Sequence, residues 1–129
     1  PLNGEINLLG LLEDTNKTFY FPKCIDENLA VCKHIGDFEV NKFNIKEPKC
    51  TPIEDLSCLD IIFVPSICAD MSKYRLGFGF GYYDKFFAKN NLRAVKILPQ
   101  AEELICKSLP KDNFDVPCDI LINQYEIMK

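Results

Sequence analysis

The sequence predicts an α/β protein with a mostly parallel β-sheet. Short segments of apolar and β-branched residues alternate along the chain with segments whose apolar side chains recur at the helical period. Residues 61–64 are four apolar side chains in succession, which is typical of a strand covered on both faces. Strands that alternate with helices usually pair in parallel, so these observations favour the α/β class.

The elements of the first half are predicted in chain order from local patterns. Aliphatic side chains near the helical period predict a helix, and aromatic or β-branched runs predict strands. Glu47–Pro48 is predicted as a turn, because a residue before proline is driven out of the helical conformation. The expected elements are a helix over 5–14, strands over 18–21 and 29–34, a less regular segment over 38–49 and a loop over 51–55.

The second half carries the clearest strand, residues 59–64, which ends at Pro65. Pro99 and Pro110 are expected to end a further strand and a helix, since proline has no amide hydrogen with which to continue the hydrogen bonding. The expected elements are strands over 59–64, 92–98 and 120–122, helices over 81–89 and 101–109, and loops over 67–74 and 111–117.

Length and composition indicate one soluble domain. The chain has 129 residues, of which 47% are hydrophobic and 26% are charged, an ordinary globular balance. Its formal net charge of −4 argues against a general nucleic-acid binder, because such proteins cluster Lys and Arg against phosphates. No apolar run approaches the ~18 residues that span a bilayer. We therefore expect a single domain over residues 1–129, monomeric and cytoplasmic, without nucleic-acid or membrane partners.

Seven cysteines are spread along the chain, and none forms a Cys-x-x-Cys pair. Several lie inside apolar segments, where a free thiol behaves as a small hydrophobic side chain. We therefore expect reduced thiols rather than a disulfide scaffold. Cys32 and His34 could supply two zinc ligands, but the sequence offers no second close pair, so a zinc site is disfavoured.

The most informative segment is the glycine-rich turn, residues 75–81, which precedes a predicted helix. Gly77, Gly79 and Gly81 allow positive φ and a close approach of the backbone to a ligand. Amides at the start of the helix favour an anion, and Arg75 adds a fork of donors suited to phosphate or carboxylate. The turn is therefore predicted to bind a phosphate-bearing ligand. The alternative is a tight connection that binds nothing.

Two familiar phosphate motifs do not fit this turn. Its glycines do not complete G-x-G-x-x-G, and no G-K-[ST] follows them. Asp84, in the predicted helix, could hold a hard cation shared with phosphate oxygens, or its charge could favour the helix N-terminus. The aromatic pairs Tyr82/Phe86 and Tyr83/Phe87 recur four residues apart and should face the core or a ligand.

The order of these motifs resembles the 5-formyltetrahydrofolate cyclo-ligase family, whose members are also called methenyltetrahydrofolate synthetases. The string from Arg75 to Asp84, R-L-G-x-G-x-G-Y-Y-D, is specific to that family. Further segments agree in order and extend the resemblance over essentially the whole chain: Gly4-Glu5-Ile6, Tyr20-Phe21-Pro22, Ile45-Lys46-Glu47-Pro48, Asp60 to Pro65, Asp70, Phe114-Asp115 and Cys118-Asp119-Ile120.

The resemblance implies a fold and an activity. The fold would have three layers, with helices on both faces of the mostly parallel sheet, and its N-terminal helix and first strand would be missing here. The family converts 5-formyltetrahydrofolate to 5,10-methenyltetrahydrofolate while hydrolysing ATP to ADP and phosphate with Mg²⁺. The formyl oxygen would be phosphorylated, and the neighbouring ring nitrogen would then close on the activated carbon. ATP and Mg²⁺ are therefore the implied co-substrate and metal.

The resemblance also implies roles for residues of this chain. Arg75 and Tyr82 would be catalytic, and Glu5 would hydrogen-bond the pterin of the folate. Asp84 and Asp115 would hold Mg²⁺. From the residues alone, Glu5 could instead be a helix N-terminal charge and Asp115 a loop cap. ATP would be bound by Arg75, Leu76, Gly77, Phe78, Gly79, Phe80, Gly81, Tyr82 and Tyr83. The folate would be bound by Glu5, Phe78, Gly79, Phe80, Gly81 and Tyr82.

The sequence departs from the family pattern around the turn. Phe80 stands where many relatives have Lys or Gly, and Lys73 stands where a glycine is usual two residues before Arg75. A positive φ at Lys73 would strain the backbone. Two alternatives therefore stay open: a non-catalytic relative that keeps a folate or nucleotide pocket, and an α/β domain without a small ligand.

Overall fold

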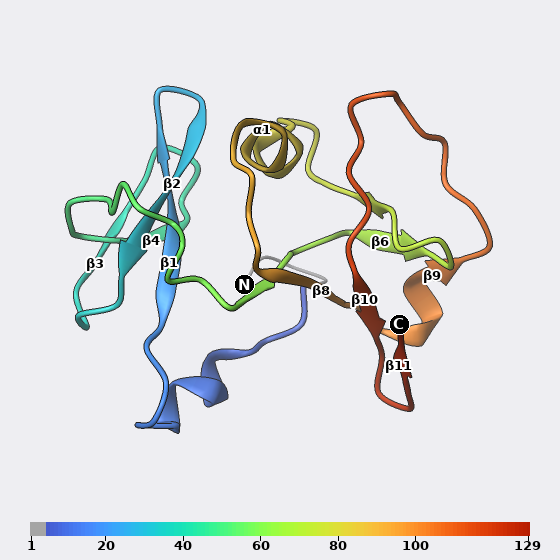
Figure 1. The fold of residues 1–129 in the computed structure, drawn as a ribbon, viewed down its shortest axis with the longest axis horizontal. Coiled ribbons are helices and arrows are strands. Elements are labelled where there is room, and N and C mark those ends of the chain that lie inside the picture. The colour runs from blue at the N-terminus through green and yellow to red at the C-terminus, as the bar shows by residue number, and fades with distance from the viewer. Residues whose placement is uncertain (1–4) are drawn as a thin grey trace. The chain divides into compact units, whose positions relative to one another are not determined.

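The computed structural model describes residues 5–129 (Figure 1). The chain divides into two compact units, Asn7–Leu56 and Ser57–Lys129, and residues 5 and 6 group with the second unit. The single domain over residues 1–129 stays a prediction. None of the helices in the described part of the chain is long and apolar enough to cross a membrane.

Two antiparallel hairpins build the first unit. β1 pairs with β2 along its whole length, and β3 pairs with β4. Asp26 and Glu27 both adopt positive φ, as two-residue hairpin turns of the I′ type require. The elements of this unit are the 3-10 helix η1 (Leu9–Glu13), β1 (Tyr20–Ile25), β2 (Asn28–Lys33), β3 (Phe38–Val40) and β4 (Lys46–Pro48).

Glu47 joins the two hairpins and corrects one expectation. Its side chain is buried, and its Oε1 accepts hydrogen bonds from the Cys24 amide and the Asn41 side chain, both at 2.8 Å. The predicted turn at Glu47–Pro48 is therefore wrong, because both residues belong to β4. Pro22 likewise lies inside β1 rather than ending it. β1 belongs to a two-stranded sheet, whose outer edge tolerates a residue without an amide hydrogen.

A four-stranded sheet in the order β11-β10-β8-β5 organises the second unit. β5, β8 and β10 are parallel, β11 is antiparallel, and a separate sheet has the order β7-β6-β9. The elements are β5 (Ile61–Phe63), β6 (Cys68–Asp70), β7 (Arg75–Leu76), α1 (Tyr82–Lys89), β8 (Val95–Pro99), the 3-10 helix η2 (Glu102–Leu104), β9 (Ile105–Cys106), β10 (Ile120–Ile122) and β11 (Ile127–Met128).

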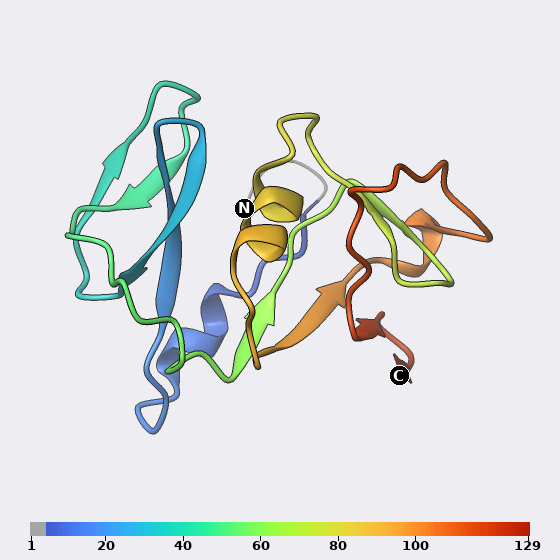
Figure 2. The same ribbon diagram turned by 45° about the horizontal axis from the view of Figure 1, so that its top comes forward.

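The core of the second unit lies between its parallel strands and α1 (Figure 2). Val64, Leu98 and Leu121 are fully buried, and Tyr83 and Phe87 of α1 pack against the cluster that they form. One of the aromatic pairs predicted on this helix therefore faces the core. Because the helix packs on the sheet, its first turn is fixed relative to the strands.

The structure confirms the parallel pairing and corrects the helix content. The predicted helix over 81–89 is α1, and the predicted strand over 120–122 is β10. The helices predicted over 5–14 and 101–109 are wrong: these segments contain only the short η1, η2 and β9. The loop predicted over 67–74 contains β6, which pairs with β7 and β9. Residues 5–129 contain a single α-helix, so the three-layer arrangement stays a prediction.

Candidate functional site

The glycine-rich turn connects β7 to α1, and its glycines serve two different needs. Gly79 has a φ of +93° and Gly81, which caps the helix, a φ of +66°, so both occupy the region that favours glycine. Gly77 has no positive φ, but it lies close to the end of the Arg75 side chain. A Cβ at Gly77 would lie 2.9 Å from Nη1 of Arg75. The turn therefore depends on glycine at positions 79 and 81, whereas a side chain at position 77 would displace the end of Arg75.

The Arg75 guanidinium is held between the sheet and the helix. Its Nη1 donates to the carbonyl oxygen of Pro65 at 2.9 Å, just beyond the end of β5. Its Cζ lies 5.0 Å from the centre of the Tyr83 ring, a distance at which a cation is attracted to the ring face. Its Nε is buried and has no hydrogen-bond partner among the described residues. The side chain is therefore oriented but not fully satisfied by the protein.

The backbone of the turn offers donors that the protein does not use. Within residues 5–129, the amides of Gly77, Phe78 and Gly79 donate to no other group of the chain. Phe80 does not withdraw into the core: its side chain is 55% exposed, and its ring lies 5.7 Å from that of Tyr82. Unused amides at the entrance to a helix form an arrangement that favours an oxyanion.

The two predicted metal ligands lie on segments that the fold joins. Oδ1 of Asp84, in the first turn of α1, accepts a hydrogen bond from the amide of Val116 at 3.2 Å. Oδ2 of the neighbouring Asp115 accepts one from the Asp112 amide at 2.8 Å, so this residue also caps its loop. The other oxygen of each carboxylate makes no hydrogen bond within residues 5–129.

These two carboxylates suit Mg²⁺ in one respect. Proteins usually hold Mg²⁺ through one or two carboxylates, and phosphate oxygens and water complete its octahedron. No group of three or more His, Cys, Asp or Glu side chains in the described part of the chain could hold a metal. Asp84 and Asp115 would therefore bind the ion together with the phosphates of a ligand.

Glu5 and Tyr82 complete the predicted set. Glu5 is half-buried and groups with the same compact unit as the turn. Tyr82 opens α1, is half-buried, and has the ammonium of Lys85 5.4 Å from the centre of its ring. Leu76 is 50% exposed at the end of β7. The structure thus brings the turn, Arg75 and Asp84 to the start of one helix.

Cys118 lies in the core, and its thiol is not activated for reaction. Burial raises the pKa of its thiol to about 11, although the positive charges of Arg75 and Lys96 act in the opposite direction. A thiol with this pKa stays protonated at neutral pH, so it is not an activated nucleophile. All seven cysteines of the chain are free thiols.

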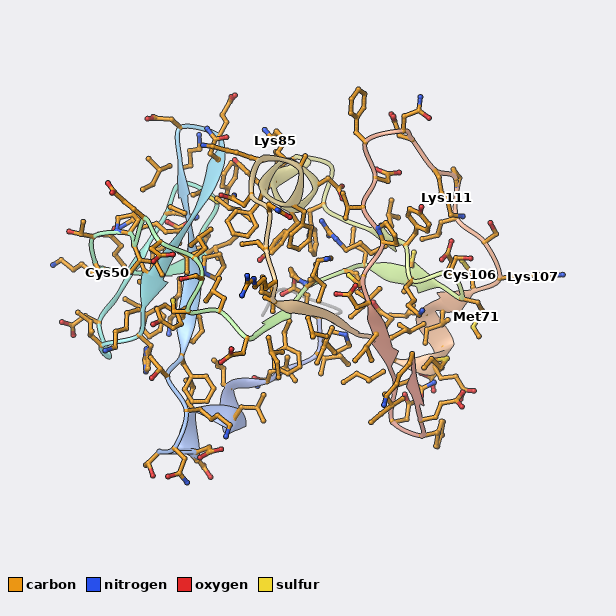
Figure 3. The ribbon with its side chains drawn as sticks, viewed as in Figure 1. Cys50, Met71, Lys85, Cys106, Lys107 and Lys111 are labelled. Atoms are coloured by element: carbon orange, nitrogen blue, oxygen red, sulfur yellow. The ribbon has the colours of Figure 1, made fainter. Side chains whose placement is uncertain are left out.

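Asp70 was recognised as part of the motif, but sequence analysis gave it no role. It is fully buried, and its Oδ1 accepts hydrogen bonds from the amides of Ser72 and Tyr74 at 2.9 and 3.0 Å. Its Oδ2 accepts one from the Leu109 amide and forms an ion pair with Lys111, each at 3.0 Å. Lys111 is labelled in Figure 3. This carboxylate therefore holds together the hairpin that leads to Arg75.

Hydrogen bonding outweighs burial at Asp70. Burial alone would raise the pKa of this carboxyl, but the Leu109 and Tyr74 amides and the Lys111 ammonium hold its pKa below the ordinary value of 3.8. The group is therefore ionised throughout the neutral range. Because its oxygens are already engaged by four donors, we assign it to the structure of the hairpin rather than to ligand binding.

Ser66 and Gln100 are two buried polar residues that the sequence patterns did not predict. Each is the residue immediately after a proline that ends a predicted strand. Both are buried, and the Ser66 hydroxyl donates to Oε1 of Gln100. The signal that could have found them is their position, since polar residues at the carboxyl ends of parallel strands commonly surround a ligand.

A parallel sheet with a glycine-rich turn near its carboxyl edge, at the entrance to a helix, defines the class as an α/β protein, and ligands of such proteins commonly bind at that edge. The model of the 5-formyltetrahydrofolate cyclo-ligase family matches residues 3–124. The chain therefore belongs to the 5-formyltetrahydrofolate cyclo-ligase family.

Curated relatives agree with this assignment. The chain is similar to the 5-formyltetrahydrofolate cyclo-ligase of Haemophilus influenzae, with 31% identity over 93% of this chain and 71% of the relative. It is also similar to a probable 5-formyltetrahydrofolate cyclo-ligase of Schizosaccharomyces pombe, with 26% identity over 88% of this chain and 64% of the relative. The chain thus spans about two thirds of the length of these proteins.

Solved structures show the same fold. A 5,10-methenyltetrahydrofolate synthetase from Aquifex aeolicus matches the whole of this chain and 68% of its own, with a TM-score of 0.84 and 27% identity. A second synthetase, from Mycoplasma pneumoniae, matches 95% of this chain with a TM-score of 0.68. At 21% identity, this second match shows the fold alone.

Proposed function

We propose that this protein converts 5-formyltetrahydrofolate to 5,10-methenyltetrahydrofolate, with ATP as co-substrate and Mg²⁺ as the metal. The observation that carries the proposal is the set of unused amides from Gly77 to Gly79, beside Arg75 and ahead of α1. Phosphoryl transfer requires positioning and charge neutralisation more than a protein nucleophile. A glycine turn with a fixed guanidinium supplies both.

Each part of the site has one task in this proposal. The turn amides and Arg75 hold the ATP phosphates, and Asp84 and Asp115 hold Mg²⁺ against them. The γ-phosphate passes to the formyl oxygen of the folate and ADP leaves. N10 of the folate, the amine nitrogen next to the pterin ring, then attacks the formyl carbon and loses its proton, and the formyl oxygen leaves with the phosphate. The protein orients these groups, and Tyr82, the first residue of α1, contacts the reacting end of the folate in this proposal.

Exposed aromatic side chains support folate binding at the same turn. Phe78 is 42% exposed and Phe80 is 55% exposed, although both are large apolar residues. A flat pterin could cover these rings and remove apolar surface from water. Glu5 would accept hydrogen bonds from the amino group and ring nitrogen of the pterin. The protein would act as a cytoplasmic monomer with the three-layer fold of its family.

The test is the appearance of methenyltetrahydrofolate, followed by its near-ultraviolet absorbance, when the protein is mixed with 5-formyltetrahydrofolate. We expect product only when both ATP and Mg²⁺ are present. Omission of either, or replacement of ATP by a non-hydrolysable analogue, is the control. A purified, folded protein that forms no product under these conditions would contradict the proposal.

A specific observation favours one alternative, a non-catalytic relative that binds folate or nucleotide. Lys73 has a φ of +69°, a strained conformation for a residue with a side chain, and it lies two positions before Arg75. Strain there could displace the guanidinium from its productive position. Calorimetry that detects folate or ATP binding, together with no ATP hydrolysis, would select this alternative.

A further inference from the structure

Ser66 and Gln100 extend the pairing of β5 and β8 beyond the ends of both strands. The strands pair in parallel up to Phe63 and Ile97, and the amide of Val64 then donates to the Ile97 carbonyl at 2.9 Å. Pro65, the next residue, has no amide hydrogen. Ser66 and Gln100 keep the same separation of 34 residues as the strand pairs, and their side chains form the hydrogen bond that follows.

This polar pair lies in an apolar environment. Ser66 is 3% exposed and Gln100 1% exposed, and Gln100 follows the strand that contributes the fully buried Leu98. Its backbone amide donates to the Ile122 carbonyl of β10 at 2.9 Å, so the residue bridges the sheet. Its Nε2 has no hydrogen-bond partner among the described residues. A buried amide with an unused donor destabilises a fold, so packing alone does not explain a glutamine here.

The pair is linked to Arg75 through one peptide group. The carbonyl of Pro65, which accepts the Arg75 Nη1 hydrogen bond, belongs to the planar peptide unit that ends at the Cα of Ser66. The ring of Pro65 fixes its own φ. Anchoring Ser66 to Gln100 therefore limits the rotation of that peptide unit. It also limits the direction in which the carbonyl points.

We propose that Gln100 is a positioning residue for Arg75 and acts through Ser66 and the carbonyl of Pro65. The anchored peptide holds the guanidinium against Tyr83 and leaves the buried Arg75 Nε–H without a partner among the described residues. The effect on ATP binding rests on the proposed function. The orientation of Arg75 is a property of the free protein and can be tested without any ligand.

Gln100→Met is the informative variant, because methionine has a similar length but no hydrogen-bonding amide. The chain has two arginines, Arg75 and Arg93, and Arg93 is exposed. Their Nε–Hε groups give two resolvable signals in ¹H–¹⁵N spectra. We expect the Arg75 signal of Gln100→Met to lose the ring-current shift from Tyr83 and move toward that of Arg93. The Arg93 signal should stay in place.

The same variant should weaken ATP binding, measured by calorimetry, by about tenfold, the effect of one misplaced charged hydrogen bond. Its melting temperature should change little, since removal of the unsatisfied Gln100 amide offsets the loss of the acceptor of the buried Ser66 hydroxyl. Ser66→Ala should also shift the Arg75 signal and weaken ATP binding. The double variant should bind ATP no more weakly than either single variant, because the two residues act through one contact. Gln124→Met, which removes an exposed amide after β10, is the matched control and should leave the Arg75 signal and ATP affinity unchanged.

The outcomes separate the two proposals. An unmoved Arg75 signal in both Gln100→Met and Ser66→Ala, with a lower melting temperature, would show a purely structural pair and overturn the positioning role. If Gln100→Met does not fold, Ser66→Ala decides the question by itself. A wild-type protein that binds no ATP would remove the proposed function, while the Arg75 signal would still decide whether Gln100 positions that residue.

Discussion

Oδ1 of Asp84 lies 3.2 Å from the amide nitrogen of Val116 and accepts its hydrogen bond. The two residues are 32 positions apart, and the bond fixes the segment that carries Asp115 beside the first turn of α1. One oxygen of this carboxylate therefore holds a loop, and the other makes no hydrogen bond within residues 5–129 and is the one proposed to bind Mg²⁺. The hydrogen bond to Val116 and the proposed binding of Mg²⁺ can therefore be separated by substitution of Asp84.

Asp84→Asn should remove the cation-binding charge and keep the loop contact, because the amide oxygen can still accept from Val116. We expect Mg²⁺-dependent activity to fall by about 100-fold or more, since even indirect contacts to a metal are worth 10- to 100-fold. The free energy of unfolding should change by less than about 1 kcal/mol. Coupled absorbance kinetics and urea unfolding measure the two effects.

Asp60→Asn is the matched control for this variant, since Asp60 is an exposed carboxylate of the same unit. Asp60→Asn should leave the Mg²⁺-dependent activity and the free energy of unfolding unchanged. If Asp84→Asn lowers stability and leaves the activity per folded molecule intact, the carboxylate is a structural residue and not a metal ligand.

Asp70→Asn should destabilise the protein by about 3 kcal/mol at pH 7, because it removes the charge of a fully buried carboxylate that is held by three backbone amides and by the partly exposed Lys111. The pKa of Asp70 is lower in the folded protein than its ordinary value of 3.8. Its stabilising effect is therefore complete above that value and is lost as the pH falls through the lower, folded-state pKa. Urea unfolding should show the gap between variant and wild type narrowing below pH 3.8.

Lys111→Met provides the comparison for Asp70, because it removes the partly exposed partner and leaves the three backbone donors. We expect a loss of about 1 kcal/mol or less. A larger loss than that of Asp70→Asn would show that the ammonium, and not the hydrogen bonds from the backbone, holds the hairpin.

Gly81→Ala should destabilise the protein by about 1–2 kcal/mol, because alanine is strained at a φ of +66°. Gly10→Ala is the control: a Cβ there meets no atom within 4 Å, and the φ of Gly10 is not positive. It should be neutral or stabilise by up to about 1 kcal/mol. Thermal or urea unfolding checks both, and equal effects would contradict the requirement for glycine at the helix entrance.

Lys73→Gly should stabilise the protein by about 0.5–1 kcal/mol. A φ of +69° destabilises a lysine by about 1–2 kcal/mol, and glycine removes this strain. The greater conformational freedom of glycine in the unfolded chain offsets part of the stabilisation. Asn44→Gly is the matched control, since asparagine tolerates its φ of +60° and little should be gained. A Lys73→Gly variant less stable than wild type would show that the lysine side chain contributes more than its backbone strain removes.

Local patterns were sufficient where an element is defined by its own residues. Glycines followed by an aromatic stripe predicted α1, and a short apolar run predicted β10. They failed for residues 101–109, whose helical spacing was overruled when Ile105 and Cys106 paired with β6. Local patterns also failed at Glu47, where the following proline predicted a turn. The buried carboxylate of Glu47 links two hairpins, and this tertiary contact outweighs the local preference, so the residue lies in a strand.

The sequence by itself determined the glycine-rich turn, since positive φ, a helix start and Arg75 are specified within a dozen consecutive residues. It also carried the family motif that names the chemistry. Only the tertiary structure decided how that turn is oriented. The Pro65 carbonyl accepts a hydrogen bond from Arg75, 10 residues away. Ser66 donates one to Gln100 over 34 residues, and Asp84 accepts one from the Val116 amide over 32 residues. Contacts of this range depend on strand register and helix packing, which local propensities do not encode.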